Sequence, residues 1–169
     1  MVNFVTHQTR EFPGNFREST IEEAVRYCSS RSVLGVDTET AGMDFLTKKV
    51  IMFQIGDENQ QFVIDTRYVS IEPLRPVLES KDIVKIFHNV KFDYKFIKRW
   101  YNIECENIYD TMIVECLLTC GRDGVGKSLN ALTEKYLNIT LDKSVRNKFI
   151  GLEGAPYTED QIIYGARDV

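Results

Sequence analysis

The sequence of 169 residues is poor in the features that mark several common classes of protein. Of its four cysteines, Cys116 and Cys120 lie close together, but no second pair and no histidine lies near them, so a zinc site is not expected. No apolar run approaches the ~18 residues of a membrane helix, and the N-terminus has no signal-peptide pattern. We therefore expect reduced cysteines, a cytoplasmic, intracellular location and no membrane contact.

Positive charge is also scarce. The chain has 21 Lys and Arg against 25 Asp and Glu, a formal net charge of −4. Proteins that grip long nucleic acids along a groove are usually basic. Any contact with nucleic acid is therefore expected to be short and metal-assisted, as it would be for a few nucleotides at a strand end.

The chain shows no repeat, low-complexity stretch or linker. Its length and its hydrophobic content of 43% fit one domain with a substantial core, over residues 1–169. Residues 1–19 are expected to form an N-terminal extension with a strand and a loop. The chain ends one residue after Asp168, so we expect the last helix to be truncated.

Patterning predicts alternating strands and helices. Strands are expected at 33–38, 49–57, 61–65 and 83–89. Helices are expected at 20–30, 71–79, 92–101, 109–119 and 128–137, with a last one after Thr158. The strongly apolar segment KVIMFQIGD is expected to be central in the sheet. This order indicates an α/β fold with a mixed central sheet flanked by helices.

Two acids lie on the first of these strands, in the segment VLGVDTET. Val33, Leu34 and Val36 are apolar, which favours a strand. Side chains two residues apart on a strand share a face, so Asp37 and Glu39 are expected to project together.

Further candidates lie in the segments HNVKFDYKF, which contains Asp93, and IIYGARDV. Thr158 with Gln161 three residues later predicts a capping box at the start of a helix. Tyr164 and Asp168 then lie four residues apart, on one face of that helix.

The four carboxylates, Asp37, Glu39, Asp93 and Asp168, would repel one another at one point, and burial would raise their pKa values. Divalent cations with a preference for oxygen ligands, Mg²⁺ or Mn²⁺, resolve this conflict. Two such ions at about 4 Å separation clamp the attacking and leaving oxygens of a phosphoryl transfer. The set therefore predicts a site for two metal ions.

These motifs resemble those of the DEDD-type 3′→5′ exonuclease domain, in the branch with a motif tyrosine that includes ribonuclease D and the proofreading domain of family A DNA polymerases. The first motif matches Asp37-Thr38-Glu39, the second matches Asn89 to Asp93, and the third matches Tyr164-x-x-x-Asp168. The resemblance runs from about Val33 to the last residue and implies a ribonuclease H-like fold.

The resemblance also implies roles. Asp37 would bridge both ions, Glu39 and Asp168 would complete the first ion's ligands, and Asp93 would reach the second ion. Tyr164 would orient the attacking water. Because a tyrosine with a pKa near 10 is a poor base at neutral pH, we expect positioning rather than proton removal.

Other candidates lie beside the acids. Thr38, His88, Asn89 and Lys91 are candidate substrate-binding residues. The alternatives are packing for Thr38, local capping for His88 and Asn89, and a solvated helix face for Lys91. Asp110 precedes a predicted helix, where a carboxylate favours the helix dipole, and is expected to be its cap.

One rival motif is Gly121 to Ser128, which satisfies G-x-x-x-x-G-K-S, the phosphate-binding P-loop. A P-loop needs a preceding strand and most of its sheet after the loop. Only 41 residues remain and none form a clear apolar strand. We expect these glycines to join two helices instead.

Together these features predict a hydrolase that removes nucleoside 5′-monophosphates from the 3′ end of single-stranded DNA, with a DNA polymerase domain in cis or in trans as a partner. The alternative enzyme is a ribonuclease D-like RNA trimmer, because the acids do not distinguish deoxyribose from ribose. A non-catalytic nucleic-acid-binding module is the alternative of another class.

Overall fold

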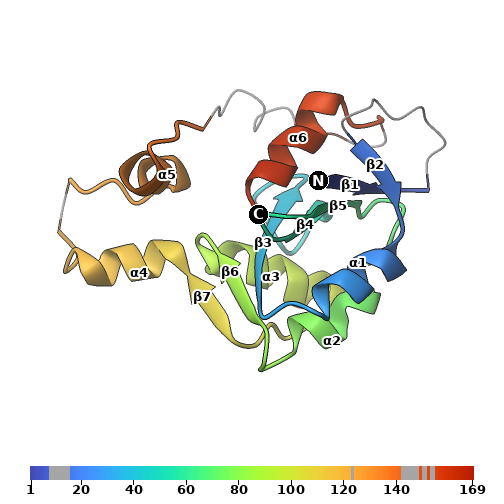
Figure 1. Ribbon diagram of the computed structural model, residues 1–169, viewed down its shortest axis with the longest axis horizontal. Coiled ribbons are helices and arrows are strands. Elements are labelled where there is room, and N and C mark those ends of the chain that lie inside the picture. Colours follow the sequence, from blue (N-terminus) through green and yellow to red (C-terminus); the bar gives the residue numbers. More distant parts are fainter. Residues whose placement is uncertain (8–15, 123, 142–148, 150–151, 153–154) are drawn as a thin grey trace.

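A computed structural model describes residues 1–7, 16–122, 124–141, 149, 152 and 155–169 (Figure 1). Seven strands form one sheet in the order β2-β1-β5-β4-β3-β6-β7. The strands are β1 (Val2–Val5), β2 (Phe16–Ser19), β3 (Val33–Thr40), β4 (Val50–Gly56), β5 (Gln61–Asp65), β6 (Val84–Phe87) and β7 (Ile108–Asp110). The helices are α1 (Ile21–Cys28), η1 (Glu72–Leu74, 3₁₀), α2 (Arg75–Leu78), α3 (Val90–Tyr101), α4 (Thr111–Leu118), α5 (Leu129–Leu137) and α6 (Glu159–Arg167).

The sheet is mixed, as the sequence predicted. β4 runs antiparallel to both of its neighbours, β3 and β5, whereas the other paired strands are parallel. Every residue of β4 is buried, which fits its apolar sequence and confirms its central position.

Helices cover the two faces of the sheet unequally (Figure 1). On one face α1, α2 and α3 pack over a core that includes Leu34, Phe53 and Ile97. On the other face α6 packs over a second core that includes Met52 and Ile162. Because side chains alternate along a strand, successive residues of β3 face different helices.

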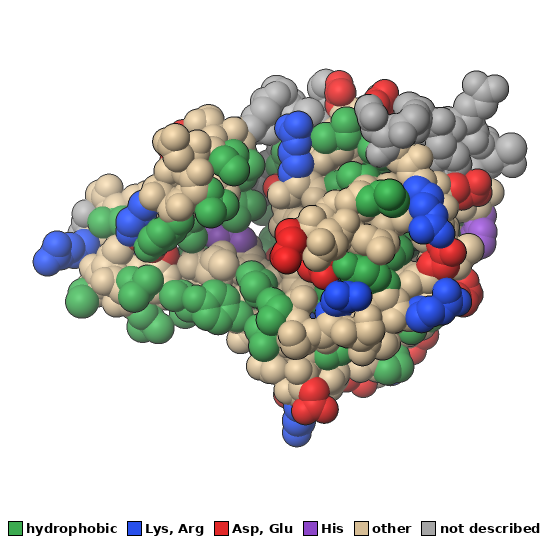
Figure 2. Space-filling view, in the orientation of Figure 1, with side chains coloured by type: hydrophobic (Ala, Val, Ile, Leu, Met, Phe, Trp, Pro, Cys, Tyr) green, Lys and Arg blue, Asp and Glu red, His purple; other side chains and the backbone are tan. Residues whose placement is uncertain are grey.

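Helices α4 and α5 form an arm that extends from the sheet (Figure 1). The buried Glu115 of α4 accepts hydrogen bonds from Lys135 Nζ and Tyr136 Oη of α5, both at 2.7 Å, and so joins the two helices. Figure 2 shows hydrophobic side chains gathered along this arm. None of the helices in the described ranges combines the length and the apolar content of a membrane span.

The glycine-rich segment that resembles a P-loop lies between α4 and α5, as predicted. Gly121 and Gly124 have φ angles of 68° and 79°, in the left-handed region that glycine tolerates best. A helix precedes the segment where a P-loop requires a strand, so the P-loop interpretation fails.

Several predicted boundaries were wrong. The strand expected at 83–89 ends at Phe87, so His88 and Asn89 lie in the turn that follows. The helix expected at 71–79 divides into η1 and α2, and the short strand β7 precedes α4 where a helix was expected to begin. The helix expected at 20–30 runs from Ile21 to Cys28, with Thr20 as its cap.

Candidate active site

The site lies beside β3, at the point where β3 and β6 stop pairing. β3 pairs with β6 only over Val33–Gly35, whereas it pairs with β4 as far as Thr40. Within the described residues, the half of β3 that carries the acids therefore has a neighbouring strand, β4, on one side only. A groove of about 360 Å³ opens beside this half of the strand. All five predicted catalytic residues line this groove. They are Asp37, Glu39, Asp93, Tyr164 and Asp168.

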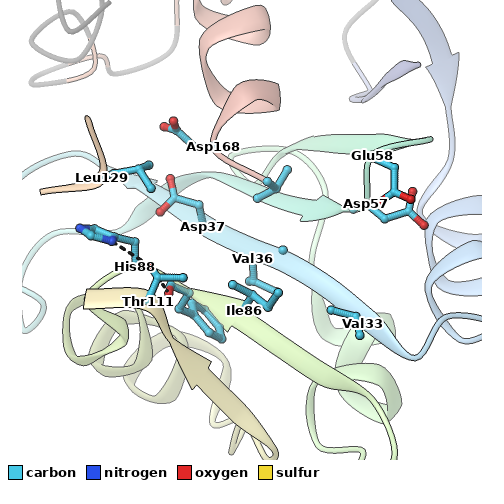
Figure 3. A pocket seen from close by; sticks show the side chains of 14 residues that line it. Val33, Val36, Asp37, Asp57, Glu58, Ile86, His88, Thr111, Leu129 and Asp168 are labelled. Atoms are coloured by element: carbon cyan, nitrogen blue, oxygen red, sulfur yellow. Dashed lines mark hydrogen bonds between the residues drawn. The ribbon is translucent and has the colours of Figure 1, made fainter. Parts of the chain in front are cut away.

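Three of the acids come together closely. Asp37, Glu39 and Asp168 each offer one carboxylate oxygen, and these oxygens lie within 4.8 Å of one another. Figure 3 shows the carboxylates of Asp37 and Asp168 near each other and projecting to the same side. Asp37 and Glu39 share the face of β3 that α6 covers, as predicted from their spacing.

The end of α6 places Asp168. The predicted capping box is formed at the start of this helix, where Thr158 accepts from the Gln161 backbone N–H and Gln161 Oε1 accepts from the Thr158 backbone N–H. Asp168 is the residue that follows the last helical turn, and its backbone N–H donates to the Gly165 carbonyl. The helix that carries Asp168 therefore begins at the residue that the sequence predicted.

Asp93 reaches the groove from the opposite side of β3. It lies in the first turn of α3, is 2% exposed, and accepts a hydrogen bond of 2.5 Å from Thr38 Oγ1. Because Thr38 alternates with Asp37 and Glu39 along the strand, Asp93 stands apart from the group of three. The predicted packing of Thr38 thus includes a direct contact with a candidate metal ligand.

Burial and crowding raise the pKa values of two of these acids, Asp37 and Asp93. Burial, followed by the charges of Asp93, Asp168 and Glu39, raises the pKa of Asp37 well above its usual range. Burial also raises the pKa of Asp93 to about 7, although the Thr38 hydrogen bond acts in the other direction. A divalent cation among these oxygens would favour the ionised forms, so the donor set fits Mg²⁺ or Mn²⁺.

Tyr164 lies on α6, one turn before Asp168, and lines the same groove. Its ring packs at 5.9 Å from the ring of Phe149. The structure therefore places the tyrosine beside the acids, as the spacing of the third motif predicted.

His88 and Asn89 line the groove from the turn after β6. His88 Nδ1 lies 2.9 Å from Thr111 Oγ1, and the Thr111 hydroxyl also lies 3.2 Å from the Phe87 carbonyl, to which it donates. Burial lowers the pKa of His88, so its ring is neutral at physiological pH. Of the four predicted substrate-binding residues, Lys91 is exposed and does not line the groove, whereas Thr38, His88 and Asn89 do.

Asp110 has a larger capping role than the sequence indicated. As predicted it caps α4, through the backbone N–H groups of Met112 and Ile113. It also accepts from the backbone N–H groups of Asn89 and Val90 at the start of α3. One buried carboxylate thus holds the turn that carries His88 and Asn89. The pairing of β7 with β6 places Asp110 opposite Phe87, next to this turn.

The arm supplies groove residues that sequence reasoning missed. Met112, Ser128, Leu129 and Asn130 line the groove opposite the acids. A neighbouring pocket of about 280 Å³ shares Asp37, His88, Leu129 and Asp168 with it (Figure 3). The sequence carries no local signal for these residues, because they reach the acids only through the packing of the arm.

Known proteins share this sequence pattern. The sequence profile of a family described as 3′-5′ exonuclease matches residues 16–169. DNA polymerase I of Aquifex aeolicus is 34% identical over 153 residues, which cover 90% of this chain and 24% of that protein. Ribonuclease D of Zymomonas mobilis is 29% identical over 144 residues, which cover 83% of this chain and 36% of that protein.

The fold is shared as well. The catalytic core of RRP6 from Trypanosoma brucei superposes with a TM-score of 0.79 at 20% identity, over 99% of this chain and 43% of that one. The predicted ribonuclease H-like fold is thereby confirmed. The chain spans about a quarter to a third of the length of the two relatives compared by sequence.

Proposed function

The chain belongs to the family of 3′→5′ exonucleases, hydrolases that act on phosphodiester bonds, and we propose that it removes nucleoside 5′-monophosphates from the 3′ end of single-stranded DNA. The observation that carries this proposal is the convergence of acids from distant parts of the chain. Asp37 and Glu39 of β3 and Asp168 at the end of α6 bring their oxygens within 4.8 Å.

Asp37, Glu39 and Asp168 would hold the first of two divalent ions, and Asp93, across β3, would hold the second with Asp37. Bound there, such ions would lower the pKa of a water and stabilise the charge on the leaving 3′ oxygen. The ligand oxygens belong to a strand and to the ends of two helices, so little backbone motion is needed to present them.

The remaining residues of the groove would handle the substrate. The Tyr164 hydroxyl would orient the attacking water, since its ring is already held against Phe149. His88, neutral because burial lowers its pKa, lines the groove and would contact the terminal nucleotide, with its ring oriented by the contact of Nδ1 with Thr111. Thr38 would act through Asp93, whose carboxylate it orients.

The choice of DNA rests on the relative with the higher identity, a DNA polymerase I, and it makes a polymerase domain the proposed partner, in cis or in trans. Ribonuclease D-like trimming of RNA is the second candidate, because a ribonuclease D matches over 83% of the chain. A binding module without catalysis is disfavoured, since all four acids line the groove.

The test uses 5′-labelled single-stranded DNA and RNA of one sequence, each incubated with Mg²⁺, Mn²⁺ or EDTA. We expect a DNA ladder that shortens from the 3′ end and is absent in EDTA and with Asp37→Ala. If the RNA were shortened faster than the DNA, RNA rather than DNA would be the substrate. No ladder with either metal would overturn the proposed function.

A further inference from the structure

Gln54 occupies an unusual position for a polar side chain. It lies in the middle of β4, directly opposite Asp37 in the register of β3 and β4, and none of its surface is exposed. Residues directly opposite in antiparallel strands point to the same face, with Cβ atoms about 5 Å apart. The amide of Gln54 therefore lies beside the acid that is proposed to bridge both ions.

Helix α6 encloses this amide from above. A Cβ atom built on Gly165 would lie 2.7 Å from Gln54 Nε2 and 2.8 Å from Met52 Sδ. The helix backbone thus rests directly on the amide, and the absence of a side chain at Gly165 makes room for it. Asp168 follows one turn later, so Gln54 lies between the strand acid and the helix that carries the other.

Within the described part of the chain, neither Nε2 nor Oε1 of Gln54 has a hydrogen-bond partner. Leaving one such buried group unpaired costs about 1–3 kcal/mol. Val63, its register partner on β5, and Met52, beneath the same glycine, are apolar, so a hydrophobic side chain would fit on that side. The Gln54 amide is therefore expected to gain a hydrogen-bond partner in another state of the site.

We propose that Gln54 is a positioning residue for the metal site: its Nε2–H donates to the Asp37 carboxylate when a cation is bound, and so fixes the orientation in which that carboxylate bridges. The inference rests on the proposed function. Carboxylates that bind metals are commonly held by such outer hydrogen bonds, and loss of one typically weakens metal affinity or activity about 10–100-fold.

The test compares Gln54→Met, which keeps the length of the side chain and removes its hydrogen bonds, with the wild type. Mn²⁺ affinity is measured by electron paramagnetic resonance, and stability by thermal unfolding in EDTA. We expect Mn²⁺ affinity to fall about 10–100-fold, with unfolding in EDTA at the same temperature or higher. Met52→Leu, beneath the same glycine, is the matched control and should retain wild-type affinity.

The possible results distinguish a failure of this inference from a failure of the proposed function. Wild-type Mn²⁺ affinity in Gln54→Met, with Asp37→Ala unable to bind, would overturn this inference and leave the proposed function standing. Failure of the wild type itself to bind Mn²⁺ would overturn both. A lower unfolding temperature of Gln54→Met and of Gln54→Leu in EDTA would show that the amide already has partners without metal, which also contradicts the inference.

Discussion

Replacing Asp93 by asparagine should stabilise the metal-free protein at pH 8 and change its stability little at pH 4. Asparagine keeps the shape of the side chain and an oxygen for the Thr38 hydroxyl, but it cannot ionise. Burial raises the pKa of Asp93 from its usual 3.8 to about 7. Between these values the folded state binds more protons than the unfolded state, so stability falls as the pH rises, and the loss is complete above about pH 7.

The size of the stabilisation at pH 8 follows from the raised pKa of Asp93. A rise from 3.8 to about 7 corresponds to roughly 4 kcal/mol at pH 8, which is an upper bound because the neighbouring acids share protons. For a chain of this length, each kcal/mol shifts the unfolding temperature by roughly 2–4 °C. The unfolding temperature of Asp93→Asn in EDTA at pH 8 should therefore exceed that of the wild type by up to roughly 16 °C.

The assay is thermal unfolding followed by circular dichroism in EDTA from pH 4 to pH 8. Asp82→Asn, at an exposed loop position, is the control and should follow the wild-type curve. Saturating Mg²⁺ should stabilise the wild type more than Asp93→Asn at pH 8, since the ion offsets the charge that the substitution removes. If the unfolding temperatures of Asp93→Asn and the wild type changed in parallel with pH, the reasoning would be refuted.

Asp37→Ala should abolish 3′-end hydrolysis, by more than ~100-fold, with an unchanged circular dichroism spectrum, because it removes the bridging ligand. Tyr164→Phe should slow hydrolysis by only roughly 10-fold, since one hydrogen bond is lost and the ring remains; equal losses in both variants would contradict these roles. Asp110→Ala should lower the free energy of unfolding by about 2 kcal/mol in urea, because two helix starts lose one cap. Gly165→Ala should destabilise by about 1–3 kcal/mol through contact with Gln54, and an unaffected urea midpoint would refute that packing.

Three of the four acids could be found from the sequence because each has a local signal, whereas Asp93 was identified by its match to the second motif. Asp37 and Glu39 interrupt an apolar strand at spacing two, and Asp168 ends a helix whose start is marked by Thr158 and Gln161. Strand alternation and helix capping are properties of a few neighbouring residues, so they can be predicted before the fold is known.

Contacts between distant segments could not be predicted in this way. Asp110 was expected to cap one helix and caps two, because the three-residue strand β7 places it beside the turn after β6. Such a strand is too short to produce a periodic pattern. Thr38 was a candidate for substrate contact, with packing as the alternative, and its hydroxyl donates to Asp93, which depends on how α3 crosses the sheet.

The contacts of Glu23 show the same limit. Thr20 accepts from the Glu23 backbone N–H, and the Glu23 carboxylate accepts from the Ser19 hydroxyl and the Arg17 guanidinium. The parallel pairing of β2 with β1 places Ser19 and Arg17 at the sheet edge, which the local pattern does not reveal.

The most direct test of the metal-dependent exonuclease measures metal binding and hydrolysis on the same preparations. Mn²⁺ is titrated calorimetrically into EDTA-stripped wild type and Asp37→Ala at pH 8, and each sample is then given 5′-labelled single-stranded DNA. The account predicts two ions per wild-type chain and a ladder shortening from the 3′ end, with neither in Asp37→Ala. A ladder that persists in Asp37→Ala, or in the stripped wild type without added metal, would contradict it.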